Sequence, residues 1–181
     1  MAAARDPGAE GALSMAENLR IGRMYFVLLA IFAVARFAQG AMGVEYAKAH
    51  HVFSIFILTV MASVFYSAFC RRWRGFRLLQ AVGLGAMFGF IAQVVIFLAT
   101  VISYALGIDT FFNHPTALNQ ESAVPLARAI GIRAPALVIF PIINAIAATI
   151  GWALGGLLPD AAAVRVAPVV PGTATPPRVV A

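Results

Sequence analysis

The stretch VFSIFILTVMASVFYSAFCRRWRGFR, residues 52–77, decides the fold. Its first part, 52–70, contains no charged residue and is long enough to cross the hydrocarbon core of a bilayer as an α-helix. The part that follows holds four arginines, and arginine-rich loops next to apolar helices stay on the cytoplasmic side of a membrane. The stretch therefore predicts a transmembrane helix whose cytoplasmic end lies at about residue 70.

Three further apolar runs, over 24–44, 78–108 and 134–158, are also long enough to span. The third of the four runs would be about 46 Å long as a straight helix, so it must tilt, bend or protrude from a hydrocarbon core about 30 Å thick. In the last run, Pro141 predicts a kink because proline removes a backbone hydrogen bond. We therefore predict an all-α membrane protein, an antiparallel bundle of four transmembrane helices within 21–158.

The distribution of basic residues sets the predicted orientation. Arginines of the two terminal segments and of the 71–77 loop outnumber Lys48, Arg128 and Arg133, which fall on the opposite side. Both termini are therefore expected inside. The predicted long outer loop includes a short interfacial helix within 122–131, with Pro125 in its first turn and Gly131 as its stop.

Composition supports a membrane location. Of 181 residues, 62% are hydrophobic and 11% are charged, and the mean hydropathy is +0.90, so there are too few charges to cover a soluble surface. The lipid bilayer is the expected partner. Despite a formal charge of +6, nucleic acid is not expected, because the basic residues flank apolar runs instead of lining one face. Lys48 is the single lysine among 13 basic residues, a bias that favours a bacterial inner-membrane protein.

Two terminal segments lie outside the predicted bundle. Residues 1–20 form a polar tail, too long and without the cleavage site that a signal peptide would have. Residues 159–181 are rich in proline, alanine and valine without periodicity, which predicts disorder.

Four polar residues are expected at mid-membrane depth: Arg36, Gln39, Gln93 and Asn144. A charge at this depth costs about 2.5–3.5 kcal/mol on insertion scales, so Arg36 must face the bundle interior or snorkel to the surface. One interpretation is a site for a polar or anionic ligand. The alternative is hydrogen bonding between helices, which amide side chains commonly provide.

All three histidines, His50, His51 and His114, fall on the predicted outer side. They are candidate ligands for a metal or a haem, although no cofactor is predicted outright. The alternative is that they only mark the membrane interface. Adjacent histidines on a helix point about 100° apart and seldom bind one ion.

Small residues recur at four-residue spacing in two runs, which lets helix backbones approach closely. Gly85 and Gly89 form a GxxxG motif, and Ala147, Gly151 and Gly155 form a second ladder. Packing within the chain is one interpretation, and a face for a second copy or a partner protein, giving a homo- or hetero-oligomer, is the other.

No catalytic motif is present, and the lone Cys70 excludes paired-cysteine chemistry, so an enzyme is not favoured. The leading hypothesis is a non-catalytic membrane protein, an accessory or complex subunit. The first alternative is a carrier or binder of a small polar or anionic ligand, and the second is a redox component with a cofactor at the outer histidines. The absence of Asp and Glu from all four runs argues against an ion-driven pump.

Overall fold

The computed structural model describes residues 15–158, which form helices, turns and loops with no strand among them. Four helical segments within this range are long and apolar enough to cross a membrane, so the prediction of an all-α chain with four such helices is confirmed. The helices are α1 (Met15–Ile21), α2 (Arg23–Ala41), α3 (Tyr46–Ala49), α4 (Ile55–Arg74), α5 (Leu78–Leu106), the 3-10 helix η1 (Pro115–Leu118), α6 (Leu126–Arg133) and α7 (Ala136–Gly155).

The boundaries follow local chemistry. Helix α4 begins after Ser54, whose hydroxyl accepts the backbone N–H of Ile57 at 3.4 Å. It runs through three of the predicted loop arginines and ends where Gly75 takes a left-handed conformation with φ of 68°, which glycine adopts without strain. The predicted cytoplasmic end at residue 70 therefore marks the end of the apolar run and not the end of the helix.

The fourth apolar segment is divided. Residues 134–135 form a turn between α6 and α7, ahead of Pro141, which lies inside α7. The predicted helix within 122–131 is α6, but its stop at Gly131 is wrong because the helix continues to Arg133. Pro125 is the N-cap of α6, where its missing N–H costs nothing.

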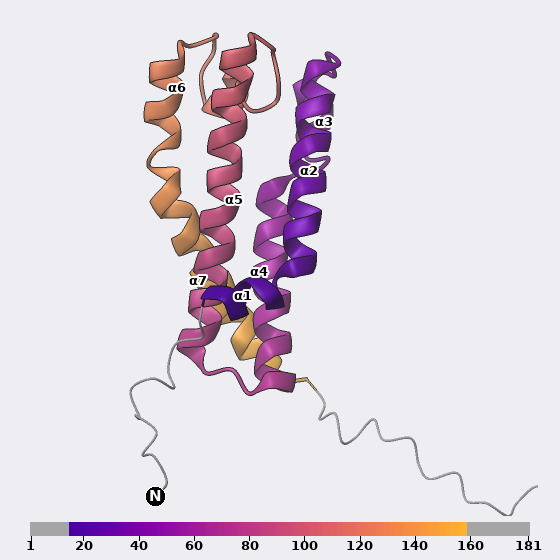
Figure 1. Cartoon of the computed structure of the whole chain (residues 1–181), viewed down its shortest axis with the longest axis vertical. Coiled ribbons are helices and arrows are strands. Elements are labelled where there is room, and N and C mark those ends of the chain that lie inside the picture. The colour runs from indigo at the N-terminus through magenta and orange to yellow at the C-terminus, as the bar shows by residue number, and fades with distance from the viewer. Residues whose placement is uncertain (1–14, 159–181) are drawn as a thin grey trace, which may run out of the picture.

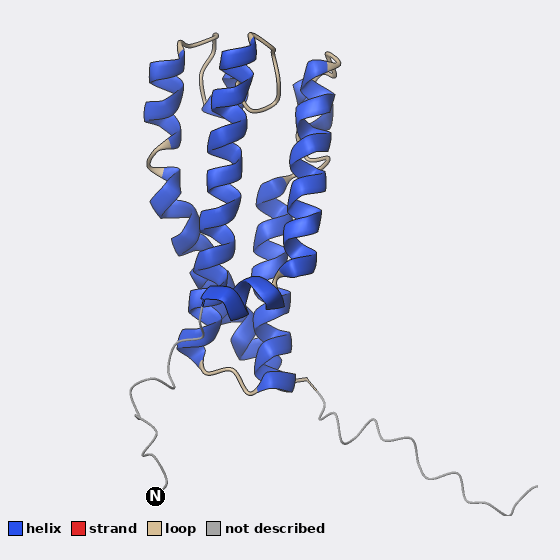
Figure 2. Ribbon diagram, viewed as in Figure 1, coloured by secondary structure: helices blue, strands red, loops and turns tan. Residues whose placement is uncertain are grey.

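The helices are arranged around α7, which packs closely against both α4 and α5. In Figure 1, α1, the 75–77 loop and the end of α7 lie at one end of the molecule, and α3, α6 and the 107–125 segment lie at the other. Figure 2 shows that most of the described chain is helical and that the loops lie mainly at the two ends of the molecule. The predicted disordered tail, 159–181, lies outside the described residues, as does 1–14 of the predicted N-terminal tail.

The predicted small-residue motifs lie at the close helix crossings. A Cβ at Gly89 would lie 2.8 Å from the carbonyl oxygen of Phe140, and a Cβ at Gly85 would overlap the carbonyl oxygen of Asn144. Phe140 and Asn144 both belong to α7. On the other side of α7, Gly151 contacts Val64 and Gly155 contacts Ala68, both on α4, while Ala147 is buried. These residues therefore let α7 approach α5 and α4 with almost no side chain between the backbones.

Helix α2 is attached differently, through aromatic rings. Tyr25 stacks on Phe88 of α5 with ring centroids 4.3 Å apart, and its hydroxyl lies 3.1 Å from Thr59 Oγ1 of α4. Phe26 and Tyr66 also contact the Phe88 ring. Large side chains, and not glycines, therefore fill the space between this half of α2 and its neighbours α4 and α5.

Candidate functional site

A cavity of about 250 Å³ lies at the end of the molecule that carries α3 and α6. Its polar lining is Arg36, Tyr46, Ser54, Gln93 and Arg133. Its aromatic lining is Phe56, Phe111, Phe112 and Phe140. We call this space the arginine cavity, since two arginines from helices far apart in the sequence meet there.

Arg36 reaches the arginine cavity from the second half of α2. Its Nη1 donates a hydrogen bond of 2.9 Å to the carbonyl oxygen of His50, in the segment between α3 and α4. Its Cζ lies 5.4 Å from the ring centroid of Phe111 and 6.0 Å from that of Tyr46, within the range of cation–π attraction. The His50 carbonyl and the Tyr46 side chain engage only part of the five donors of the guanidinium, so donors remain for another acceptor.

Arg133, the last residue of α6, comes from the other side. Its Nη2 donates to the carbonyl oxygen of Phe112 at 3.0 Å, and its Nε is buried without a partner. The charges of Arg133 and Arg36 are close enough to repel each other, and the Tyr46 hydroxyl lies near both. From the sequence, Arg133 was expected only as a basic residue on the outer side, and it was not predicted as part of a site.

The position of Arg133 depends on the fold of the 107–125 segment. Asn113 closes a turn there, accepting from the Thr110 backbone N–H at 2.7 Å and donating to the Ile108 carbonyl at 3.0 Å. This turn buries the rings of Phe111 and Phe112 beneath the arginines. Gly40 of α2 allows the contact, because a Cβ there would lie 2.5 Å from Thr110 Cα. No local pattern in the sequence indicates this arrangement.

Gln93 of α5 supplies a neutral donor. Its side chain is only 3% exposed, and its Nε2 is buried without a hydrogen-bond partner. None of the described residues that line the arginine cavity is Asp or Glu. The cavity therefore presents two cations and an unpartnered amide N–H₂, a set that calls for an acceptor with negative charge.

The other two residues of the predicted polar cluster lie outside the lining of the arginine cavity. Asn144 accepts from the Ser63 hydroxyl of α4 at 2.9 Å and donates to the Phe140 carbonyl at 2.9 Å. It therefore joins α7 to α4 at their crossing. Gln39 has a buried Oε1 without a partner. The structure thus brings together Arg36 and Gln93 and leaves Asn144 as a packing residue.

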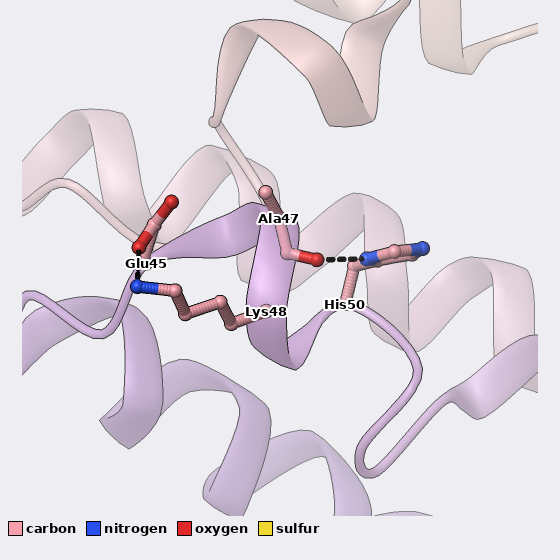
Figure 3. Close-up of polar contacts among 4 residues, drawn as sticks. All are labelled: Glu45, Ala47, Lys48 and His50. Carbon is pink, nitrogen blue, oxygen red and sulfur yellow. Dashed lines mark hydrogen bonds and ion pairs between the residues drawn. The ribbon is translucent and has the colours of Figure 1, made fainter.

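The histidines lie around Tyr46, beside the arginine cavity. His114 stacks on the Tyr46 ring with centroids 4.5 Å apart, and the rings of His50 and His51 lie 3.6 Å apart. Figure 3 shows His50 Nδ1 at 3.0 Å from the Ala47 carbonyl oxygen. A second cavity of about 540 Å³ is lined by Glu45, Tyr46, Ala47, His50, His114 and Thr116.

The candidate metal ligands come from two segments: His50 and His51 follow α3, and His114 precedes η1. Glu45 pairs with Lys48 across the short helix α3, as Figure 3 also shows. Among residues 15–158, no group of three or more His, Cys, Asp or Glu side chains is arranged to hold a metal ion. A metal or haem role for His50, His51 and His114 stays a prediction.

Comparison of the chain with protein-family models, with curated proteins and with solved structures gave no match. The function therefore has to be argued from the geometry of the arginine cavity.

Proposed function

We propose that this chain is an integral membrane protein that binds a small anionic group in the arginine cavity. In this proposal the four long helices form an antiparallel bundle across a bacterial inner membrane, with the 71–77 loop inside and the arginine cavity toward the outer face. The observation that carries it is the convergence of Arg36, Arg133 and the unpartnered Gln93 amide without a carboxylate in the lining.

Holding two cations in one cavity costs free energy. Each guanidinium loses hydration there, and the pair repel each other. An oxyanion between them would offset both costs, and a guanidinium can bind such a group through two parallel N–H···O bonds. Gln93 Nε2 would add a third donor, which removes its unsatisfied hydrogen-bonding capacity.

The alternative of an accessory subunit has less support from the geometry. The sequence favoured it because small-residue packing motifs are present and catalytic motifs are not. Gly85, Gly89, Gly151 and Gly155 all contact neighbouring helices of the same chain, so they do not carry that argument. A subunit role stays a prediction, and it does not conflict with binding an anion.

The test is ligand-induced stabilisation of the full chain in neutral detergent. Inorganic phosphate and dodecyl phosphate are compared with chloride at constant ionic strength, and the unfolding temperature is recorded. A ligand at about 100 times its Kd stabilises the folded state by about 2.7 kcal/mol. Arg36→Leu is expected to abolish this stabilisation without destabilising the bundle, since it also removes a poorly hydrated charge.

Two further variants sharpen the test. Arg36→Lys is expected to lose much of the stabilisation, because an ammonium does not replace the planar fork of donors. Arg128→Gln is the matched control. Arg128 is the third residue of α6, and its exposed side chain donates to Gln120 Oε1 and does not line the arginine cavity. If wild type and Arg36→Leu respond equally to both phosphates, the proposal is wrong.

A further inference from the structure

We infer that the anion in the arginine cavity is the headgroup of an amphiphile, with its acyl chain leaving between α4 and α7 into the bilayer. This inference rests on the proposed function and identifies the class of ligand: an oxyanion such as a phosphate ester that carries a hydrocarbon chain. It follows from the lateral wall of the cavity, its extent and its size.

The lateral wall of the cavity, between α4 and α7, contains a pair of aromatic rings. Phe56 of α4 and Phe140 of α7 both line the arginine cavity, and their ring centroids lie 5.5 Å apart. Phe56 is 51% exposed, and its neighbour Ile57 and the α7 residue Ile139 are 48% and 54% exposed. In a bilayer this exposed apolar surface faces acyl chains. A small movement of these two rings would connect the cavity to lipid, where a hydrocarbon chain is solvated.

The cavity extends from the N-terminal end of α4 to the middle of α5. Ser54, the N-cap of α4, lines it, together with the first two residues of that helix, Ile55 and Phe56. The end of a spanning helix lies near the polar interface, and the N–H groups of a helix N-terminus favour an anion. Gln93, which is almost fully buried and whose amide Nε2 has no partner, lines the same space. In this inference the lipid phosphate lies between the N-terminus of α4 and these donors.

The volume of the arginine cavity limits which part of an amphiphile it can hold. A volume of about 250 Å³ is many times the roughly 10–15 Å³ that one water needs, and it is enough for a phosphate and a short linker. An acyl chain would have to lie outside, against the exposed apolar residues of α4 and α7. Phe111 and Phe112 lie beside the arginines, whereas Phe56 and Phe140 line the cavity between α4 and α7. A lining that holds both charged donors and apolar rings matches an amphiphile better than a free ion.

The experiment uses the full chain in nanodiscs of phosphatidylcholine, with Phe56→Trp as a reporter at the proposed exit. A low mole fraction of phosphatidic acid with brominated chains is compared with the same fraction of brominated phosphatidylcholine. The signal of Trp73 and Trp152, measured in the chain without Phe56→Trp, is subtracted. We expect the anionic lipid to quench the reporter selectively, because it is enriched there about 30-fold, about 5-fold for each of two arginines.

Selective quenching is expected to fall to the phosphatidylcholine level with Arg36→Gln and to persist with Arg128→Gln. Native mass spectrometry of the wild type, which needs no reporter, is expected to show one retained anionic lipid that Arg36→Gln loses. If both brominated lipids quench equally while inorganic phosphate still stabilises the protein through Arg36, the inference is overturned and the proposed function stands. If neither phosphate nor anionic lipid depends on Arg36, both are wrong.

Discussion

The substitution Gly151→Ala adds a single methyl group at the closest helix crossing in the described chain, between α7 and α4. The added Cβ would overlap the carbonyl oxygen of Val64 and would lie 2.7 Å from the Val64 Cα. These are backbone atoms, which cannot rotate away as a flexible side chain would. The two helices would have to move apart along the crossing, and contacts on both sides of Gly151 would be lost.

Gly83→Ala provides the matched control. Gly83 lies on α5, and a Cβ there would meet nothing within 4 Å. Replacing glycine by alanine inside a helix is favourable by about 0.5–1 kcal/mol, and this term is common to both variants. The difference between them therefore isolates the cost of overpacking, typically about 1–3 kcal/mol, and we expect the upper half of that range at a backbone contact.

The assay is reversible unfolding by sodium dodecyl sulfate added to neutral detergent micelles, followed by far-ultraviolet circular dichroism. Gly151→Ala is expected to unfold at a lower denaturant fraction than wild type, and Gly83→Ala at the same or a higher one. Equal midpoints for the two variants would refute the close crossing of α4 and α7. The bulkier Gly151→Leu and Gly89→Leu are expected to lose more stability than Gly151→Ala.

Three further predictions concern other parts of the chain. Trp152→Phe removes an indole N–H that donates to the Phe76 carbonyl at 2.8 Å, so we expect a loss of about 1 kcal/mol in the same unfolding assay. Asn144→Ala is expected to cost about 0.6 kcal/mol for its bond between helices while phosphate still stabilises the protein, whereas a role in the site would abolish that response. A cysteine introduced at Thr116, in a Cys70→Ser background, is expected to react with a membrane-impermeant maleimide in intact cells; labelling only after permeabilisation would invert the proposed orientation.

The helical content and the four apolar segments could be predicted because their causes are local. An uninterrupted apolar run of this length has few alternatives to a spanning helix, and Ser54 and Gly75 have chemistry suited to helix ends. Boundaries were less accurate where two local signals compete. The arginines after Cys70 end the apolar run but are good helix formers, so α4 continues to Arg74.

The arginine-rich loop shows a second limit. From the sequence, the basic residues of this loop indicate the side of the membrane, and Trp152 is expected only to anchor its helix at the membrane interface. In the structure Arg71 donates to the Trp152 carbonyl at 2.7 Å and lies over the Trp152 ring at 3.8 Å. A guanidinium at the end of a helix satisfies carbonyls that have no partner within that helix. Which arginine takes this role depends on how α4 and α7 cross, and no run of residues contains that information.

Of the two arginines in the arginine cavity, Arg36 could be predicted from the sequence and Arg133 could not. Arg36 is conspicuous because an apolar run makes any charge within it expensive, a cost that can be counted from neighbouring residues alone. Arg133 has no such signal, since a basic residue between a polar loop and an apolar run is ordinary at a membrane interface. It reaches the cavity only because the turn at Thr110 and Asn113 folds Phe112 beneath it. A second cation beside the first, with no acidic residue in the lining, makes an anionic ligand a better explanation of Arg36 than snorkelling to the surface, and that conclusion required the tertiary fold.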